Sequence, residues 1–172
     1  MTDCRTESHT MPISGSCLCG GVQFEISSAN GPSEICHCTR CRKKSGATSL
    51  EMIEVRSENF VLNAGKDLIS VYEAPILNQP PSYTSYFCSR CGSPVPPASP
   101  NGDTIEIPAG LFDDNPGVQP DKHIFVDFKS PWHVIGDSLP QMNLRDLIEH
   151  RFGRSLPKDH QVTDHSGAKR KV

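Results

Sequence analysis

The sequence has little of what a membrane-spanning, secreted or nucleic-acid-binding protein requires. No stretch of its 172 residues approaches the roughly 20 consecutive apolar residues of a membrane span. The segment 1–16 is polar and has no apolar run, so we expect no secretory signal and a cytoplasmic location. The formal net charge is -3, whereas a nucleic-acid partner requires a basic face. We therefore expect neither a membrane nor a nucleic acid as the main partner.

Aromatic residues are also few, at 6% of the chain, whereas proline is frequent, with 15 residues. This composition is typical of one loop-rich domain and not of a long-helix bundle. Apolar residues alternate with polar ones in Val22–Ile26, which predicts a half-buried strand. Similar short segments, separated by turns rich in Gly, Pro, Asn and Asp, indicate a mainly β domain. Further strands are expected at Leu50–Val55, Asn59–Leu62, Leu68–Tyr72, Tyr83–Cys88, Thr104–Ile107, His123–Phe128 and Trp132–Ile135.

Two helical segments are expected beside the strands. The segment 39–46 predicts one short helical turn that ends at Gly46, with basic residues in its last turn. Apolar residues recur at helical spacing between 144 and 152, which predicts an amphipathic C-terminal helix with Asn143 as its N-cap. From Gly153 onward the chain is polar, so we expect a disordered tail.

Cysteine is the residue type in which the chain is rich, because seven of its eight cysteines fall into three tight clusters. The clusters are the pairs Cys17-x-Cys19 and Cys88-x-x-Cys91 and the triple Cys36-His37-Cys38-x-x-Cys41. An even count could also form a secreted disulfide framework. The polar start, the length of the chain and the short spacings, which set two sulfurs on one cation, favour metal instead. Cys4 lies outside every cluster and is expected to be a free thiol.

The two kinds of cluster predict two kinds of metal site. Two pairs can join into a closed site of four thiolates, which holds a fold together, whereas a triple leaves one tetrahedral position open for chemistry. Three thiolates make zinc a weak Lewis acid, so capture of an incoming thiolate suits such a site better than generation of hydroxide. The sequence thus predicts one structural zinc and one reactive, more labile zinc.

The residues around the triple admit more than one role. Arg40, Arg42, Lys43 and Lys44 could offset the charge of the thiolates, hold a carboxylate of a substrate, or form a solvated helix face. His37 lies between two ligating cysteines, so its side chain is expected to point away from the metal. For His123 we weigh a structural hydrogen bond against a substrate-facing role, and for Trp132 we favour core packing.

Three blocks of sequence together resemble the glutathione-dependent formaldehyde-activating enzyme family, whose domain also occurs in centromere protein V. These blocks are Gly15-Ser16-Cys17-Leu18-Cys19-Gly20, Cys36-His37-Cys38-Thr39-Arg40-Cys41 and Phe87-Cys88-Ser89-Arg90-Cys91-Gly92. Ala109-Gly110-Leu111-Phe112-Asp113 and His123-Ile124-Phe125-Val126 with Trp132 resemble the later blocks of the family. The resemblance covers about residues 13–140, and Thr48-Ser49 depart from it where members often carry Pro-Phe.

The resemblance implies a β-tent of small antiparallel sheets pinned by a structural zinc, with a short C-terminal helix outside it. It assigns the structural zinc to Cys17, Cys19, Cys88 and Cys91, and the catalytic zinc to Cys36, Cys38 and Cys41. The implied activity is carbon–sulfur lyase chemistry on S-hydroxymethylglutathione, formed from formaldehyde and glutathione. We therefore divide the chain into a flexible segment (1–12), a zinc domain (13–140), and a helix with a disordered tail (141–172).

Two other functions compete with this interpretation. A non-catalytic zinc module for protein binding would have its triple closed by His37, by another side chain or by a residue of a partner. A sulfoxide reductase, which shares the β-tent fold, would need a free catalytic cysteine beyond the zinc pairs, and no cysteine follows Cys91. The occupancy and accessibility of the second metal site therefore distinguish an enzyme from a binding module.

Overall fold

The computed structural model describes residues 11–29, 31–74, 82–163 and 169–171. Cys4 and most of the segment 1–12, for which flexibility was expected, lie outside the described residues. The described chain consists mainly of short strands with two short α-helices, so the mainly β fold class is confirmed. None of its helices is long and apolar enough to cross a membrane.

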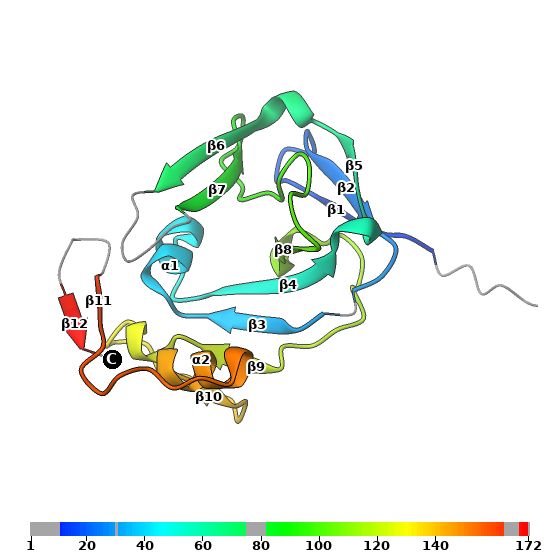
Figure 1. Cartoon of the computed structure of the whole chain (residues 1–172). Helices are drawn as coiled ribbons and strands as arrows, with labels where there is room; N and C mark the ends of the chain where they lie inside the picture. The colour runs from blue at the N-terminus through cyan, green and yellow to red at the C-terminus, as the bar shows by residue number, and fades with distance from the viewer. Residues whose placement is uncertain (1–10, 30, 75–81, 164–168, 172) are drawn as a thin grey trace, which may run out of the picture.

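The strands of the described chain form four small sheets. One has three antiparallel strands in the order β1 (Ile13–Ser16), β2 (Gln23–Ile26) and β5 (Phe60–Ala64). The largest has five strands in the order β10 (Gln141–Met142), β9 (Lys122–Ile124), β3 (Ser33–Cys36), β4 (Leu50–Arg56) and β8 (Thr104–Pro108). Two antiparallel ribbons pair β6 (Ile69–Ala74) with β7 (Tyr83–Cys88), and β11 (Gln161–Thr163) with β12 (Lys169–Lys171). Figure 1 shows the β6–β7 ribbon on the opposite side of α1 from β3 and β4.

The expectation of antiparallel sheets holds except at one edge of the five-stranded sheet. There β9 runs parallel to both β3 and β10, whereas β4 is antiparallel to β3 and to β8. The parallel pairs join segments that are distant in sequence, since parallel strands need a long crossover connection. This edge brings the C-terminal part of the chain beside the cysteine triple.

Residue alternation along β4 and β8 separates the core from a second, polar face. Ile53 of β4 pairs with Ile107 of β8, and both are buried in the main hydrophobic cluster with Phe24. Glu54 pairs with Glu106 on the opposite face, because successive side chains of a strand point to opposite sides. One face of the sheet therefore packs on the β1–β2–β5 sheet, and the other carries charged groups.

Both expected helices are present with the expected ends. The short helix α1 (Thr39–Ser45) begins after Cys38 and ends at Gly46, which has the left-handed φ of 69° that glycine adopts readily. The helix α2 (Leu144–Phe152) begins with a capping box between Asn143 and Asp146. Four short 3-10 helices complete the described elements, namely Ser57–Asn59, Lys66–Leu68, Ala109–Leu111 and Val126–Phe128.

The C-terminal part of the chain departs from the sequence-based expectations. The expected strand His123–Phe128 stops at Ile124, because Phe125 takes a left-handed conformation with a φ of 56° that leaves the sheet. The segment Trp132–Ile135 is not a strand, since the backbone N–H of His133 closes a turn on Ser130.

The segment from Gly153 onward also departs from the expectation. Its polar composition predicted disorder, whereas the strands β11 and β12 pair there into a ribbon. Backbone pairing between the two strands supplies the order that a polar composition alone does not indicate.

Candidate metal centres

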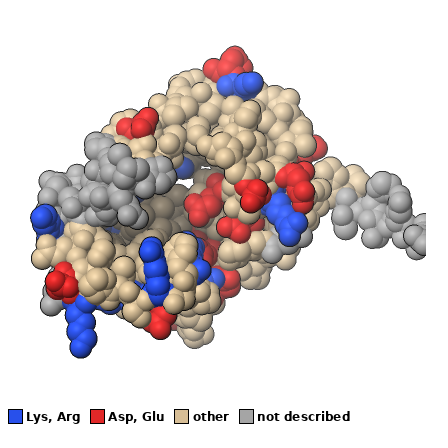
Figure 2. Space-filling model, in the orientation of Figure 1, with Lys and Arg blue, Asp and Glu red and all other residues tan. Residues whose placement is uncertain are grey.

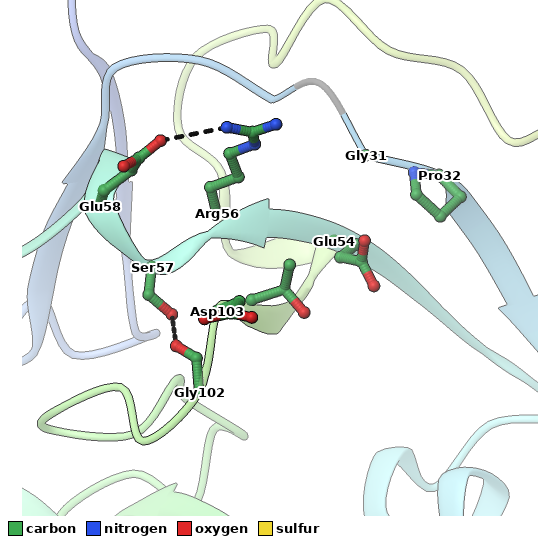
Figure 3. A pocket seen from close by; sticks show the side chains of 9 residues that line it. Gly31, Pro32, Glu54, Arg56, Ser57, Glu58, Gly102 and Asp103 are labelled. Carbon is green, nitrogen blue, oxygen red and sulfur yellow. Dashed lines mark hydrogen bonds and ion pairs between the residues drawn. The ribbon is translucent and has the colours of Figure 1, made fainter.

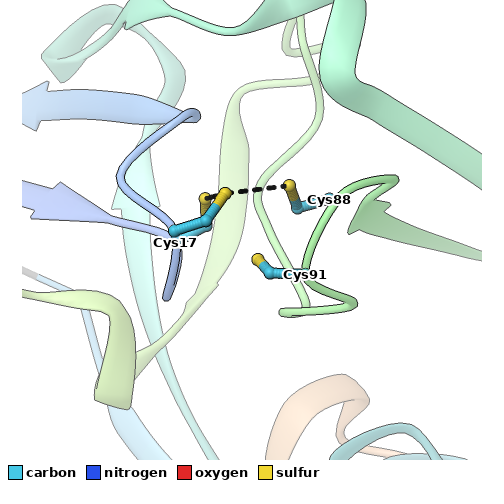
Figure 4. Close-up of side chains that lie close together, drawn as sticks. Cys17, Cys88 and Cys91 are labelled. Atoms are coloured by element: carbon cyan, nitrogen blue, oxygen red, sulfur yellow. Dashed lines mark hydrogen bonds between the residues drawn. The ribbon is translucent and has the colours of Figure 1, made fainter.

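The first candidate centre is made by the two cysteine pairs. Cys17 and Cys19 lie on the loop after β1, Cys88 ends β7, and Cys91 lies in the turn that follows. Their four Sγ atoms lie within 4.8 Å of one another, although the pairs are far apart in sequence. Figure 4 shows the sulfur atoms directed toward a common point between the two loops.

The spacing of these sulfurs fits a tetrahedral metal. The Sγ atom of Cys19 lies 3.5 Å from that of Cys17 and 3.9 Å from that of Cys88. Zn–S bonds of about 2.3 Å place the sulfurs of a tetrahedral site about 3.8 Å apart. The backbone N–H of Val22 lies 3.3 Å from the Cys17 sulfur, and the side chain and backbone of Ser93 lower the pKa of Cys91 to about 6. The donor set, its spacing and this support for thiolates all fit zinc.

The second candidate centre is the cysteine triple. Cys36 is the last residue of β3, Cys38 is the N-cap of α1, and Cys41 lies in the first turn of α1. Their Sγ atoms also lie within 4.8 Å of one another, and Cys38 and Cys41 are only partly buried. The Cys38 sulfur accepts the N–H of Cys41 at 3.4 Å, so the helix start holds one thiolate. None of the seven cysteines in the described residues is in a disulfide.

Electrostatics within the triple indicate a need for a cation. Hydrogen bonds from the thiols of Cys36 and Cys41 lower the pKa of Cys38 to about 3, so one thiolate forms readily. The same contact with Cys38, followed by the contact with Cys41 and by burial, raises the pKa of Cys36. A second and third thiolate are therefore disfavoured unless a metal ion offsets their charge. The triple thus also fits a thiolate-bound metal.

His37 points away from both sulfur neighbours, as expected from its place between them. Its side chain is fully buried, and its Nε2 atom lies 2.8 Å from Nδ1 of His123. The other nitrogen of His123 lies 3.0 Å from each carboxylate oxygen of Asp137. His123 is therefore a buried, hydrogen-bonded residue, and the substrate-facing alternative for it is not supported.

Trp132 does not pack in the core. Its side chain is 76% exposed, and that of Val134 is 81% exposed, so the expectation of core packing was wrong. The side chains of its neighbours instead contact the rest of the site, because Arg42 donates to the Ser130 hydroxyl at 2.6 Å and His133 lies over His37, with ring centroids 5.5 Å apart. The segment 130–137 therefore contacts Arg42 and His37, which lie next to cysteines of the triple, and leaves Trp132 at the surface.

Four charged or polar side chains border the triple on its other side. Figure 2 shows a hollow in this view of the molecule with acidic side chains along its wall. Burial, followed by Cys41 and Cys38, raises the pKa of Tyr83 on β7, and the guanidinium of Arg40 lies 5.1 Å from the Tyr83 ring centroid. Lys44 and Glu106 act electrostatically on Cys41 as well. Sequence reasoning had marked Arg40 and Lys44, but Tyr83 and Glu106 carry no local motif that could have marked them.

A cavity lies at the other end of β4. Its volume is about 830 Å³, and it is lined by Gly31, Pro32, Glu54, Arg56, Ser57, Glu58, Gly102, Asp103 and Thr104 (Figure 3). Arg56 and Glu58 form an exposed ion pair there, with nitrogen and oxygen 3.3 Å apart. No cysteine or histidine lines this cavity, whereas Leu50, at the start of β4, pairs with Cys36. The reactive groups are therefore grouped at the triple and not in this cavity.

Comparison with known proteins decides the family. The profile of the family described as glutathione-dependent formaldehyde-activating enzyme matches residues 12–128. The chain belongs to this family. A Halomonas elongata protein with the provisional name of glutathione-dependent formaldehyde-activating enzyme is 28% identical over 125 residues, which are 71% of this chain and 80% of that protein. The crystal structure of a Rhodobacter sphaeroides protein is 19% identical, with a TM-score of 0.46 and coverage of 75% of this chain and 99% of that one.

The family match includes both cysteine centres, Tyr83 and Glu106. Asp137 and α2 lie beyond it, although Asp137 completes the hydrogen-bonded chain behind the triple. The part of the chain outside the glutathione-dependent formaldehyde-activating enzyme match therefore contributes to the surroundings of the candidate site.

Proposed function

We propose that this protein is a zinc-dependent carbon–sulfur lyase that interconverts S-hydroxymethylglutathione with formaldehyde and glutathione. The observation that carries the proposal is the cysteine triple, which gathers three thiols within 4.8 Å of one another and has no fourth His, Cys, Asp or Glu ligand grouped with it among the described residues. Family membership supports the choice of glutathione and formaldehyde as reactants. A site of three thiolates with an accessible fourth position suits a thiol ligand.

We assign different roles to the two centres. Cys17, Cys19, Cys88 and Cys91 would hold a structural zinc that ties the loop after β1 to the end of β7. Cys36, Cys38 and Cys41 would hold a second, more labile zinc. That zinc, when bound, would supply an open coordination position that lowers the pKa of a thiol.

The chemistry at the triple is a reversible addition. The thiol sulfur attacks the carbonyl carbon of formaldehyde, a carbon–sulfur bond forms, and the electron pair of the C=O π bond moves to oxygen. That oxygen takes up the proton that the thiol has lost, so the product is a hydroxymethyl thioether and no oxidant is needed. A tyrosine hydroxyl is protonated at neutral pH and the pKa of Tyr83 is raised further, so its hydroxyl is available to donate a hydrogen bond to the oxygen as charge develops.

Cobalt substituted at the triple provides a direct test. Glutathione should strengthen the sulfur-to-cobalt charge-transfer absorption, because a fourth sulfur joins the ion, whereas the analogue with Ser in place of Cys should not. The same preparation, reloaded with zinc, should accelerate the exchange between formaldehyde and its glutathione adduct in a nuclear magnetic resonance assay.

An unchanged cobalt spectrum with glutathione and with every other small thiol tested would overturn this function. A non-catalytic zinc module for protein binding, with its triple closed by a further ligand, would then be the better interpretation.

A further inference from the structure

Most charged side chains around the triple already have a partner within the protein. Glu34 of β3 is buried, and it is neutralised by Lys122, whose Nζ lies 3.4 Å away, and by Arg151 of α2. Arg42 donates to Ser130, and Arg40 lies over the ring of Tyr83. Each of these charged groups therefore has a partner within the protein.

Lys44 and Glu106 differ from this set. Within the described residues, neither forms an ion pair or a side-chain hydrogen bond, with each other or with any other group. They are nonetheless close enough to influence each other and Cys41 electrostatically. Lys44 extends from the last turn of α1, and Glu106 stands on β8.

The strand register places Glu106 on the reactive side of the sheet. Cys36 pairs with Leu50, and Glu106 pairs with Glu54, while Leu50 and Glu54 share one face of β4 because they are four residues apart. Cys36, Glu54 and Glu106 therefore lie on the same face of the five-stranded sheet. A ligand that approaches this face would meet the carboxylates of Glu54 and Glu106 on one side and Lys44, near Cys41, on the other.

Their surroundings make both charges unfavourable in the free protein. Lys44 is half-buried and Glu106 is exposed at the edge of the site, and desolvation by the surrounding protein lowers the pKa of Lys44 and raises the pKa of Glu106, while neither charge is held in an ion pair. Titratable groups whose pKa values are perturbed in this way cluster at functional sites. A ligand that pairs with both charges would remove this disadvantage.

A positive and a negative group held near each other but unpaired match a zwitterion. We propose that Lys44 and Glu106 bind the α-amino-acid end of a thiol substrate, Lys44 its α-carboxylate and Glu106 its α-ammonium group. This subsite rests on the proposed function, and it selects thiols that carry a free γ-glutamyl terminus. A simple carboxylate end fits less well, because Glu106 and the neighbouring Glu54 would repel it.

Calorimetric titration of the metal-loaded protein with a set of thiols tests the subsite. Glutathione and γ-glutamylcysteine carry the amino-acid end, N-acetylglutathione lacks the ammonium group, and 2-mercaptoethanol lacks both charges. Lys44→Met should weaken binding of glutathione and γ-glutamylcysteine roughly tenfold or more, with binding of 2-mercaptoethanol unchanged. Glu106→Gln should weaken glutathione to the level of N-acetylglutathione and leave the latter unchanged.

Matched variants control for the change in charge. Lys43→Met, on the exposed side of the same helix, and Glu149→Gln, on α2, should bind every thiol as the natural protein does. Equal weakening of all thiols by Lys44→Met or Glu106→Gln would show an effect on the metal alone and would overturn the subsite. Unaltered binding of glutathione by both variants would overturn it too, while the proposed function would stand. If the natural protein binds none of the thiols, the proposed function fails instead.

Discussion

The Nε2 atom of His37 lies 2.8 Å from Nδ1 of His123, on the side of β3 opposite to the cysteine triple. Asp137 accepts the N–H of His123 Nε2, so Nδ1 of His123 is left to accept the N–H of His37. Burial, followed by the proximity of His123 and His133, lowers the pKa of His37 to about 4, so His37 stays neutral at physiological pH. This chain of hydrogen bonds fixes the residue that separates two of the candidate metal ligands.

Loss of this chain should weaken metal binding at the triple. We expect His37→Ala and Asp137→Asn to lower the zinc affinity of the triple by about tenfold, because residues that orient metal ligands commonly contribute at least this much. Competition with a chromogenic chelator measures the affinity, and His150→Ala on the exposed face of α2 is the control. Equal loss of zinc from the four-cysteine centre would show general unfolding and would contradict this role.

The two centres should release zinc in two steps. Four thiolates close one centre, whereas three leave the other open to competing ligands. A mild chelator should therefore remove one zinc ion per chain while the circular dichroism spectrum stays native. Release of both ions in one step, together with unfolding, would show that the centres do not have separate roles.

Single substitutions should separate the centres further. Cys88→Ser removes a ligand that ties the end of β7 to the loop after β1, so it should lower the free energy of unfolding by several kcal/mol. Cys41→Ser should abolish activity with little change in melting temperature. The expected difference appears in thermal denaturation followed beside the formaldehyde assay, and equal destabilisation by the two changes would reverse our assignment.

Sequence patterns predicted those elements whose signals are local. Alternation predicted β2 and most of β4, and Asn143 predicted the start of α2. The clusters of cysteines predicted both candidate centres, because ligand spacing is a local property. The strand β3 was missed, since Glu34 is buried there and breaks any alternation. Lys122 and Arg151, which neutralise Glu34, come from distant elements that no local pattern connects to it.

Tyr83 and Glu106, which border the triple, were not predicted either, because no local pattern connects them to the cysteines. Tyr83 and Glu106 are brought to the triple by β7 and β8, and nothing near either residue in sequence indicates this position. Core packing was expected for Trp132, although the turn closed between Ser130 and His133 leaves it exposed. Long-range pairing therefore decided the features that composition and spacing could not.

The unpaired charge of Glu106 should make the protein less stable as the pH rises. Although Glu106 is exposed, desolvation by the neighbouring protein atoms raises its pKa above the ordinary value of 4.5, so the folded protein holds this proton more tightly than the unfolded chain. The folded state is favoured while the proton is bound, and this advantage is lost as the pH rises through the raised pKa. Glu106→Gln should thus melt at a higher temperature than the natural protein at about pH 7.5, with a smaller difference at about pH 5.

Comparison at each pH cancels effects of pH on the metal centres that both proteins share. Glu149→Gln, which changes an exposed carboxylate, should show no such dependence on pH. A melting temperature of Glu106→Gln below that of the natural protein at both pH values would show that Glu106 has a stabilising partner.

Tyr83→Phe should separate catalysis from binding. The change removes only the hydroxyl and keeps the aromatic ring beneath Arg40, so the packing of the ring and its contact with the guanidinium are retained. If the hydroxyl donates a hydrogen bond to the oxygen that gains charge, kcat should fall about tenfold or more while KM and the zinc content change little. Steady-state kinetics with glutathione and formaldehyde measure both constants. Tyr86→Phe is the matched control, because Tyr86 lies on the same strand but packs against the four-cysteine centre. A Tyr83→Phe protein with unchanged kcat, or with a loss confined to KM, would remove Tyr83 from the reaction and restrict it to the wall of the site.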